Sequence, residues 1–182
     1  MRSVEITFDR ESDALIRREW DALTDAGLPS LALHTAASNR PHLTLVAGDE
    51  LAPLPFDQED VDAIPAVIDL AGLMVFPTAR DRWILVHSAV VSQPLARLQE
   101  RVARRFPGGV PTTRPGAWVP HVTLARRLTA EGVGRALHAL AEVGVREQHA
   151  IAVAAIRFWE GDTRTVSVLW RDSAAEDPLT ER

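Results

Sequence analysis

The spacing of hydrophobic and polar residues predicts strands in several segments of the chain, among them residues 41–47. Residues 4–8, VEITF, alternate apolar and polar side chains as a half-buried strand does. Residues 66–76 and 82–91 are long aliphatic stretches separated by PTARD, which favours an antiparallel hairpin. Residues 150–160 and 165–172 flank GDTR and predict a second hairpin. These patterns are typical of an antiparallel sheet.

Three segments instead show the helical period, with start and stop signals at their ends. Ser12 is a candidate cap for the first, which Gly27 ends. Ser92 is a candidate cap for the second, and the third is expected to run from Thr129 to Gly144. The residues expected to face inward are Ile16, Trp20, Leu23, Leu95, Leu98, Val102, Val133, Leu137 and Leu140.

The order of these elements predicts an α+β fold with mainly antiparallel pairing. Each half of the chain contains strands and a helix, which suggests two similar lobes. We expect one domain over residues 1–171 and a flexible polar tail over 172–182. Residues 107–117 are rich in Pro and Gly and predict a long loop.

The amino-acid composition excludes several kinds of active-site chemistry. The chain is 46% hydrophobic and 25% charged, as globular proteins are. It has no cysteine, which excludes disulfides, thiolate nucleophiles and iron–sulfur clusters, and all 20 of its basic residues are Arg, which excludes a lysine nucleophile. A formal net charge of −5 argues against an extensive nucleic-acid surface, although a small or terminal phosphate ligand remains open.

The sequence also leads to expectations for the localisation and the oligomeric state of the protein. No apolar run reaches the length of a membrane span, and the alternating start MRSVEITFDR does not resemble a signal peptide. We therefore expect a cytoplasmic protein with no membrane partner, acting as a monomer.

One pentapeptide pattern occurs twice, as PHLTL at 41–45 and as PHVTL at 120–124. On a strand, residues two apart share a face, so His42 and Thr44 point one way and the aliphatic residues the other. His121 and Thr123 are arranged in the same way. If the two lobes meet through these faces, the imidazoles converge.

Two converging imidazoles suit phosphodiester cleavage. With ordinary pKa values near 6.5, one histidine can accept a proton while the other donates one, without a metal. The attacking oxygen must lose a proton and the leaving oxygen must gain one. The Thr hydroxyls can donate hydrogen bonds to the non-bridging phosphate oxygens.

The two motifs make the chain resemble the two-histidine phosphoesterase superfamily, in particular its bacterial branch of 2′-5′ RNA ligases and RNA 2′,3′-cyclic phosphodiesterases. HLTL and HVTL match the family's paired H-x-T-x motifs, and PHVTLAR, FPTARDRWILV and PLARLQERV extend the similarity over most of residues 1–171. The resemblance implies two pseudo-symmetric antiparallel sheets with outer helices around a central cleft. It implies no metal and no other cofactor.

The resemblance also implies an activity and its residues. Family members open 2′,3′-cyclic phosphates, and some join RNA ends through 2′-5′ bonds in the reverse direction. His42 and His121 correspond to the catalytic acid and base, and Thr44 and Thr123 to the phosphate ligands. We expect His121 to act on water and His42 on the ribose oxygen. The acidic chain favours a cyclic nucleotide, a short RNA end or another small cyclic phosphate as partner.

Other residues allow both functional and structural interpretations. Trp118 could stack a base beside His121 or pack at the start of the strand. Arg114 could reach a phosphate or be an ordinary solvated loop residue. His34 and His87 lack a Thr partner and are expected to be structural. A basic ridge on the second helix could contact RNA or serve the helix dipole, and it comprises Arg97, Arg101, Arg104 and Arg105.

Two alternatives remain open. The same cleft could belong to a non-catalytic module that binds a phosphorylated nucleotide or an RNA end. Both histidines could instead be metal ligands in a hydrolase, but such a site needs further His or carboxylate ligands, and the motifs contain none.

Overall fold

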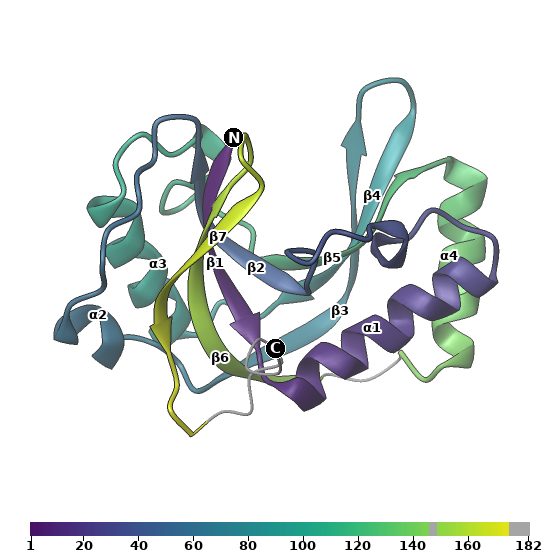
Figure 1. The fold of residues 1–182 in the computed structure, drawn as a ribbon. Coiled ribbons are helices and arrows are strands. Elements are labelled where there is room, and N and C mark those ends of the chain that lie inside the picture. Colours follow the sequence, from purple (N-terminus) through teal and green to yellow (C-terminus); the bar gives the residue numbers. More distant parts are fainter. Residues whose placement is uncertain (146–148, 175–182) are drawn as a thin grey trace.

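One antiparallel sheet of seven strands forms the centre of the computed structural model, which describes residues 1–145 and 149–174 (Figure 1). The strands are β1 (Arg2–Phe8), β2 (His42–Gly48), β3 (Val67–Thr78), β4 (Arg82–Ala89), β5 (His121–Leu128), β6 (His149–Glu160) and β7 (Thr165–Arg171). The helices are α1 (Arg10–Asp25), α2 (Gln58–Asp62), α3 (Gln93–Arg105) and α4 (Ala130–Glu142), and two 3₁₀ turns are η1 (Leu31–Leu33) and η2 (Pro111–Thr113).

The sheet folds back on itself, because β1 pairs with β6 as well as with β2. Its strand order is β1-β2-β5-β4-β3-β6-β7, and β1 also pairs with β6. We call β2, β1, β6 and β7 the β1 arm, and β5, β4 and β3 the β4 arm. The arms are joined on one side by β3 and β6, through Val67–Leu70, and on the other by a single pair between β2 and β5. The motif strands are thus neighbours in the middle of the sheet.

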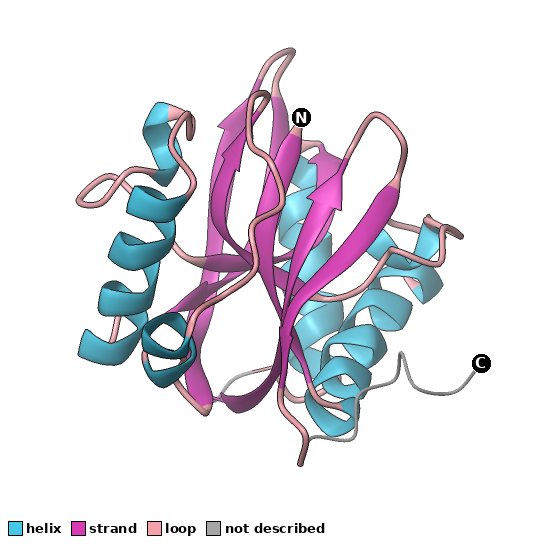
Figure 2. Cartoon of the chain, turned by 60° about the vertical axis from the view of Figure 1, so that its left-hand side comes forward, coloured by secondary structure: helices cyan, strands magenta, loops and turns pink. Residues whose placement is uncertain are grey.

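Helices cover the outer side of each arm. Helix α3 contacts β2 and α2, whereas α1 and α4 contact each other and the β5 side of the sheet. Figures 1 and 2 show the two helical layers on opposite flanks of the strands. The face of the sheet between the arms is left for the motif side chains. None of the helices in the described residues is long and apolar enough to span a membrane.

The predicted α+β class and both predicted hairpins are confirmed, because β3 pairs with β4 and β6 with β7 in antiparallel register. The two expected sheets are linked into one. The arms also differ from the two halves of the sequence, since the N-terminal β1 pairs with the C-terminal β6, and β5 pairs with β4. Of the predicted tail, residues 175–182 lie outside the described residues.

Helix α1 begins earlier than its sequence signals indicated. Asp9 is the cap, and its carboxylate accepts the backbone N–H of Ser12, so the prediction that Ser12 is the cap is wrong. A carboxylate at this position satisfies an N–H group that has no partner within the helix. The predicted caps Ser92 and Thr129 are confirmed.

The inward faces of α1 and α3 are as predicted, and on α4 Leu140 is buried and Val133 packs against the core as predicted. Gly132, Ala136, Ala139 and Leu140 are buried, whereas Leu137 is 43% exposed. Small residues let α4 approach α1 and the sheet closely, and they carry little hydropathy signal. The prediction that Leu137 faces inward is therefore wrong.

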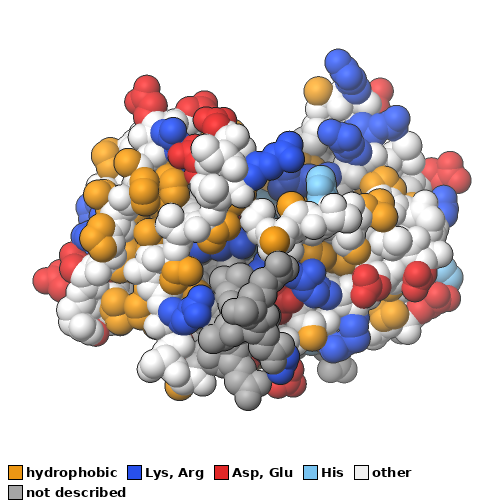
Figure 3. All heavy atoms as spheres, in the orientation of Figure 1, with side chains coloured by type: hydrophobic (Ala, Val, Ile, Leu, Met, Phe, Trp, Pro, Cys, Tyr) orange, Lys and Arg blue, Asp and Glu red, His pale blue; other side chains and the backbone are white. Residues whose placement is uncertain are grey.

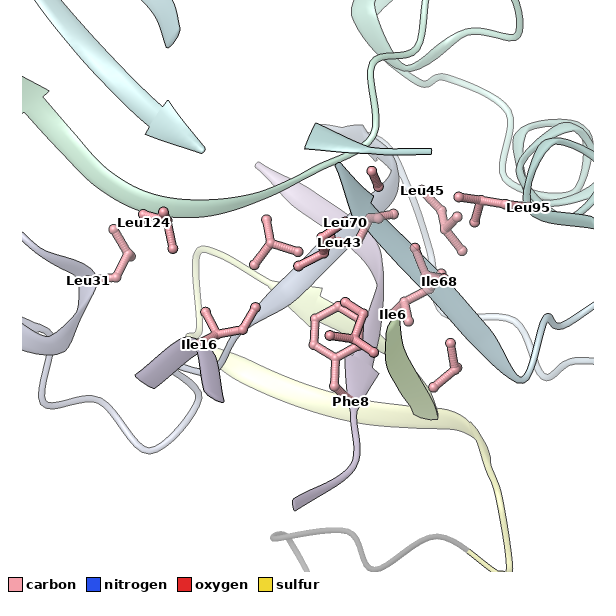
Figure 4. Close-up of a cluster of buried hydrophobic side chains, with 14 of the residues drawn as sticks. Ile6, Phe8, Ile16, Leu31, Leu43, Leu45, Ile68, Leu70, Leu95 and Leu124 are labelled. Atoms are coloured by element: carbon pink, nitrogen blue, oxygen red, sulfur yellow. The ribbon is translucent and has the colours of Figure 1, made fainter. Parts of the chain in front are cut away.

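The aliphatic residues of both motifs lie in the core. Leu43, Leu45, Val122 and Leu124 have no exposed surface. Figure 4 shows Leu43 beside Leu70 and above Ile6 and Phe8, within one continuous cluster of apolar side chains. This burial holds each motif strand in the orientation that turns its His and Thr away from the helices.

Strand β1 is buried on both faces, although its alternating pattern predicted a half-buried strand. Val4, Ile6 and Phe8 belong to the core, and the polar residues between them are also buried, with Glu5 only 4% exposed. The polar side of β1 faces the space between the two arms. A buried carboxylate at that place needs polar partners.

Candidate active site

The paired motifs meet at one point of the sheet. Leu43 of β2 pairs with Val122 of β5 in antiparallel register. The residues on either side of this pair, His42 and Thr44 on β2 and His121 and Thr123 on β5, point to the opposite face from Leu43 and Val122. The charge of His42 acts on His121, so the two imidazoles lie close to each other. All four motif side chains therefore project from one patch, related by an approximate two-fold axis through the Leu43–Val122 pair.

The backbone orients both imidazoles in the same way. His42 Nδ1 lies 2.7 Å from the carbonyl of Arg40, and His121 Nδ1 lies 2.8 Å from the carbonyl of Val119. A carbonyl oxygen only accepts, so Nδ1 must carry the hydrogen in each ring. The Nε2 atom is then the ring nitrogen that can accept a proton in both histidines.

Two indoles hold the Thr residues of the motifs. Trp118 Nε1 donates to the carbonyl of Thr44 at 2.9 Å, and Trp20 Nε1 of α1 donates to the carbonyl of Thr123 at 3.0 Å. Each motif strand is thus fastened at its Thr by a tryptophan from a distant segment. Thr44 is half-buried and Thr123 is 7% exposed.

His121 lies in an apolar and positively charged environment. The Phe76 ring of β3 lies beside it, with centroids 5.1 Å apart. Desolvation lowers the pKa of His121 below the ordinary 6.5 despite the hydrogen bond with Val119, and the nearby charges of His42 and Arg126 lower it further. The neutral form of His121 is therefore favoured, which suits a proton acceptor.

Strand β5 has a β-bulge at Arg126 and Arg127. Between the pairs Leu85–Ala125 and Trp83–Leu128, two residues of β5 lie opposite one residue of β4, and Arg127 has a φ of 64°. Such a bulge re-aims the side chains around it. Arg126 is exposed and close enough to His121 to act on its charge.

His42 faces a carboxylate instead. Its Nε2 lies 3.8 Å from Glu5 Oε1, and Glu5 Oε2 accepts from Arg157 Nε at 2.9 Å. Burial by itself would raise the pKa of Glu5, but the charges of His42 and Arg157 and the hydrogen bonds from Ser3 and Arg157 outweigh it. The pKa of Glu5 lies below its usual value, so the group is a carboxylate.

The motif patch opens onto a hollow between the arms. Figure 3 shows the surface indented there, with arginine side chains along the hollow and over the β3–β4 hairpin. Arg80 and Arg82 of this hairpin are exposed, as are Arg126 and Arg127. Positive charge thus gathers on this side of an acidic protein.

The two other candidate substrate residues differ in position. Trp118 is half-buried, and its indole N–H donates to the carbonyl of Thr44. It therefore contacts the backbone of the first motif strand. Arg114 is exposed in the long loop that precedes Trp118. The structure connects Trp118 to the motif and gives Arg114 no such connection among the described contacts.

The basic ridge of α3 is partly neutralised. Arg101 and Arg105 form ion pairs with Asp57 and Asp60 of the α2 segment, at distances of 2.8 to 3.7 Å. These pairs fasten α2 to α3 on the outer side of the β1 arm, away from the motif patch. These ion pairs give Arg101 and Arg105 of the ridge a structural role.

The remaining histidines lie outside the patch. His87 is buried, and its Nε2 lies 2.7 Å from Glu19 Oε2 on the helical side of the sheet. His34 is exposed beyond η1. Within residues 1–145 and 149–174, no three His, Asp or Glu side chains gather as metal ligands would.

Sequence patterns assigned no role in the site to four residues, namely Glu5, Trp20, Phe76 and Arg157, although Trp20 was predicted to face inward. One of them carried a signal. Arg157 is the single charged residue in the apolar stretch 150–159, and a charge in such a strand usually has a buried partner. Its partner Glu5 is 152 residues away, which local patterns cannot reveal.

Comparisons with known proteins place the chain in a family. A solved structure of Usb1 from Kluyveromyces marxianus with uridine monophosphate is similar to 92% of this chain and 97% of that one, with 12% identity and a TM-score of 0.40. No curated protein matches significantly. The family model of the 2′-5′ RNA ligase superfamily matches residues 11–165. The chain therefore belongs to the 2′-5′ RNA ligase superfamily.

Proposed function

We propose that this protein is a metal-independent phosphodiesterase that opens 2′,3′-cyclic phosphates of nucleotides or RNA ends. The observation that carries the proposal is the Leu43–Val122 pair, which brings two identically oriented imidazoles and two Thr hydroxyls to one patch. The family, whose model describes RNA ligases, supports phosphodiester chemistry. The acidic chain and the arginines beside the hollow favour a small or terminal phosphate.

Such a reaction needs two proton transfers, and we assign one to each histidine. His121 Nε2 accepts a proton from water as the water oxygen bonds to phosphorus. The bond between phosphorus and one ribose oxygen breaks, and that oxygen takes a proton from His42 Nε2. The products are a phosphomonoester and a free hydroxyl, with both histidines in the opposite protonation state, which exchange with solvent restores.

The two Thr residues are proposed to bind the phosphate. Their hydroxyls lie on the same face as the imidazoles and can donate to the non-bridging oxygens as charge develops there. Arg126, beside His121, adds positive charge at the same place. With a 5′-hydroxyl in place of water as the attacking group, the same proton transfers would break the bond from phosphorus to the 3′-oxygen and leave a 2′-5′ phosphodiester and a free 3′-hydroxyl.

Removing either imidazole should abolish most of the turnover. We expect His42→Ala and His121→Ala each to lower kcat/KM for a 2′,3′-cyclic nucleotide by about 100-fold or more, because each removes one proton transfer. The assay is run with a chelator present. His138→Ala is the control, since that side chain is 80% exposed on α4. Undiminished turnover in either motif variant would contradict the assigned roles, and nucleotide binding without any turnover by the wild type would indicate a binding module.

The Thr hydroxyls should contribute separately. Thr44→Val and Thr123→Val keep the shape of the side chain and remove its donor, so we expect kcat/KM to fall about 10- to 100-fold, as for other hydrogen bonds to charged groups. Thr44→Ser and Thr123→Ser should retain most of the activity. Thr165→Val, at the exposed start of β7, is the control. Equal activity of the Val and Ser variants would exclude phosphate binding by the hydroxyls.

The pH dependence should show the lowered pKa of His121. A base must be neutral, so activity is lost as pH falls through the pKa of His121, and burial places that limb below the ordinary 6.5. The profile of kcat/KM against pH measures it. An acidic limb above pH 6.5 would show that another group is the base.

A further inference from the structure

One border of the hollow at the motif patch is strongly basic. The β3–β4 hairpin and the bulge of β5 expose four arginines, which we call the arginine cluster, namely Arg80, Arg82, Arg126 and Arg127. Asp81 is the only carboxylate among residues 79–82 and 126–127. The tip of the β4 arm is therefore positively charged, on a protein whose formal net charge is −5.

The tip of the β1 arm carries acidic groups instead. Asp49 follows β2, and Asp162 lies in the turn between β6 and β7, with side chains 79% and 77% exposed. The N-terminal amine lies 3.3 Å from the Asp49 carboxylate and 3.9 Å from that of Asp162, so the two groups lie together. Figures 1 and 3 show both tips on the same side of the molecule, with the hollow between them. A polyanion that leaves the hollow is therefore attracted to one tip only.

The arginine cluster is not neutralised by the protein. Among the described residues, no Asp or Glu forms an ion pair with any of its four guanidinium groups. Carboxylates do pair with arginines in other parts of the structure, namely with Arg2, Arg17, Arg101, Arg105 and Arg157. Like charges that lie together repel one another, and a bound anion relieves that repulsion.

The cluster extends from the motif patch to the hairpin. The ring of Phe76 packs beside His121, with centroids 5.1 Å apart, and Thr78 shares the face of Phe76 because it is two residues farther along β3. Arg82 pairs with Thr78, and cross-strand partners share a face. Arg82 thus lies on the face that carries His121, about 7 Å beyond Phe76 along the sheet. At the near end, the charge of Arg126 acts on His121 itself.

This arrangement suits an RNA strand better than a free nucleotide. A 2′,3′-cyclic mononucleotide carries one phosphate, for which the motif patch is sufficient. In an RNA end, each preceding nucleotide adds a phosphodiester with a further negative charge, and guanidinium groups pair well with phosphate oxygens. Because the cluster is small and the protein is acidic, it fits a short stretch of single strand and not a long duplex.

We propose that Arg80, Arg82 and Arg127 bind the backbone phosphates of a single-stranded RNA whose 3′ end carries the cyclic phosphate. The strand leaves the hollow over the β3–β4 hairpin, away from Asp49 and Asp162. The inference rests on the proposed function for the group held at the motifs, and it names an RNA end as the substrate. A cyclic mononucleotide does not reach the hairpin and is therefore the poorer substrate.

The first test measures binding and needs no turnover. The Kd of a short oligouridine with a 3′-phosphate is measured by fluorescence anisotropy at several salt concentrations. In the double variant Arg80→Asn/Arg82→Gln, Kd should rise about 10-fold and depend less steeply on salt, because two phosphate contacts are lost. A short oligoadenosine should lose the same factor, since phosphate contacts do not read sequence. Asn is chosen because it tolerates the φ of 63° at Arg80.

The matched control is Arg104→Gln/Arg164→Asn, which removes the same total charge from exposed positions. Arg164 has a φ of 56°, close to that of Arg80, and lies in the β6–β7 turn at the acidic tip. Arg104 lies on α3. The control variant should keep the Kd and the salt dependence of the wild type. Equal weakening in both variants, or no weakening in the hairpin variant, would overturn the proposal.

The second test compares two substrates, the same oligouridine with a 2′,3′-cyclic phosphate end and 2′,3′-cyclic UMP. At low salt the ratio of their kcat/KM values should favour the RNA end about 10-fold or more in the wild type, and the hairpin variant should lower this ratio about 10-fold. Equal kcat/KM values in the wild type would overturn the proposal and leave the proposed function intact. If neither substrate is turned over, the proposed function fails, and the binding test still decides the role of the hairpin.

Discussion

The single contact between β2 and β5 is the constraint on which the candidate site depends. The strands pair only at Leu43 and Val122 and then diverge into different arms of the sheet. Because this pair lies in the core with no exposed surface, the register cannot slip by one residue without burying the imidazoles and exposing the aliphatic residues. Core packing thereby fixes the position of the polar patch.

The patch combines a symmetric framework with asymmetric charge. Backbone carbonyls orient both imidazoles, and indole N–H groups hold both Thr residues, in matching geometry. The surroundings differ, since His121 lies against Phe76 near Arg126, and His42 lies near Glu5. A general acid and a general base of the same residue type need such a difference, because each must hold the opposite protonation state at one pH.

Much of this arrangement could be predicted from local patterns. A period of two residues was enough to put His42 and Thr44 on one face, and the repetition of the pattern at His121 marked its partner. The α+β class followed from the order of periodic segments, and the strand neighbours of the motifs did not. On α4 the position of Leu137 was predicted wrongly, because the inward face is lined in part by Gly132 and Ala136, which have little hydropathy.

The rest depends on contacts between segments far apart in the chain. Pairing of β1 with β6 brings Glu5 to Arg157, and no local signal in either strand identifies the other. The same holds for Trp20, whose helical periodicity predicts burial but cannot show that its N–H reaches the carbonyl of Thr123. The bulge at Arg126 depends on the register with β4, which only the folded sheet defines.

The central claim is that both motif copies act on one phosphorus atom, and a crystal structure with a 2′- or 3′-nucleotide product bound tests it most directly. We expect the phosphate to accept hydrogen bonds from the hydroxyls of Thr44 and Thr123, with Nε2 of both histidines within hydrogen-bonding distance of its oxygens. A phosphate bound by one motif alone, or away from both, would contradict a shared site.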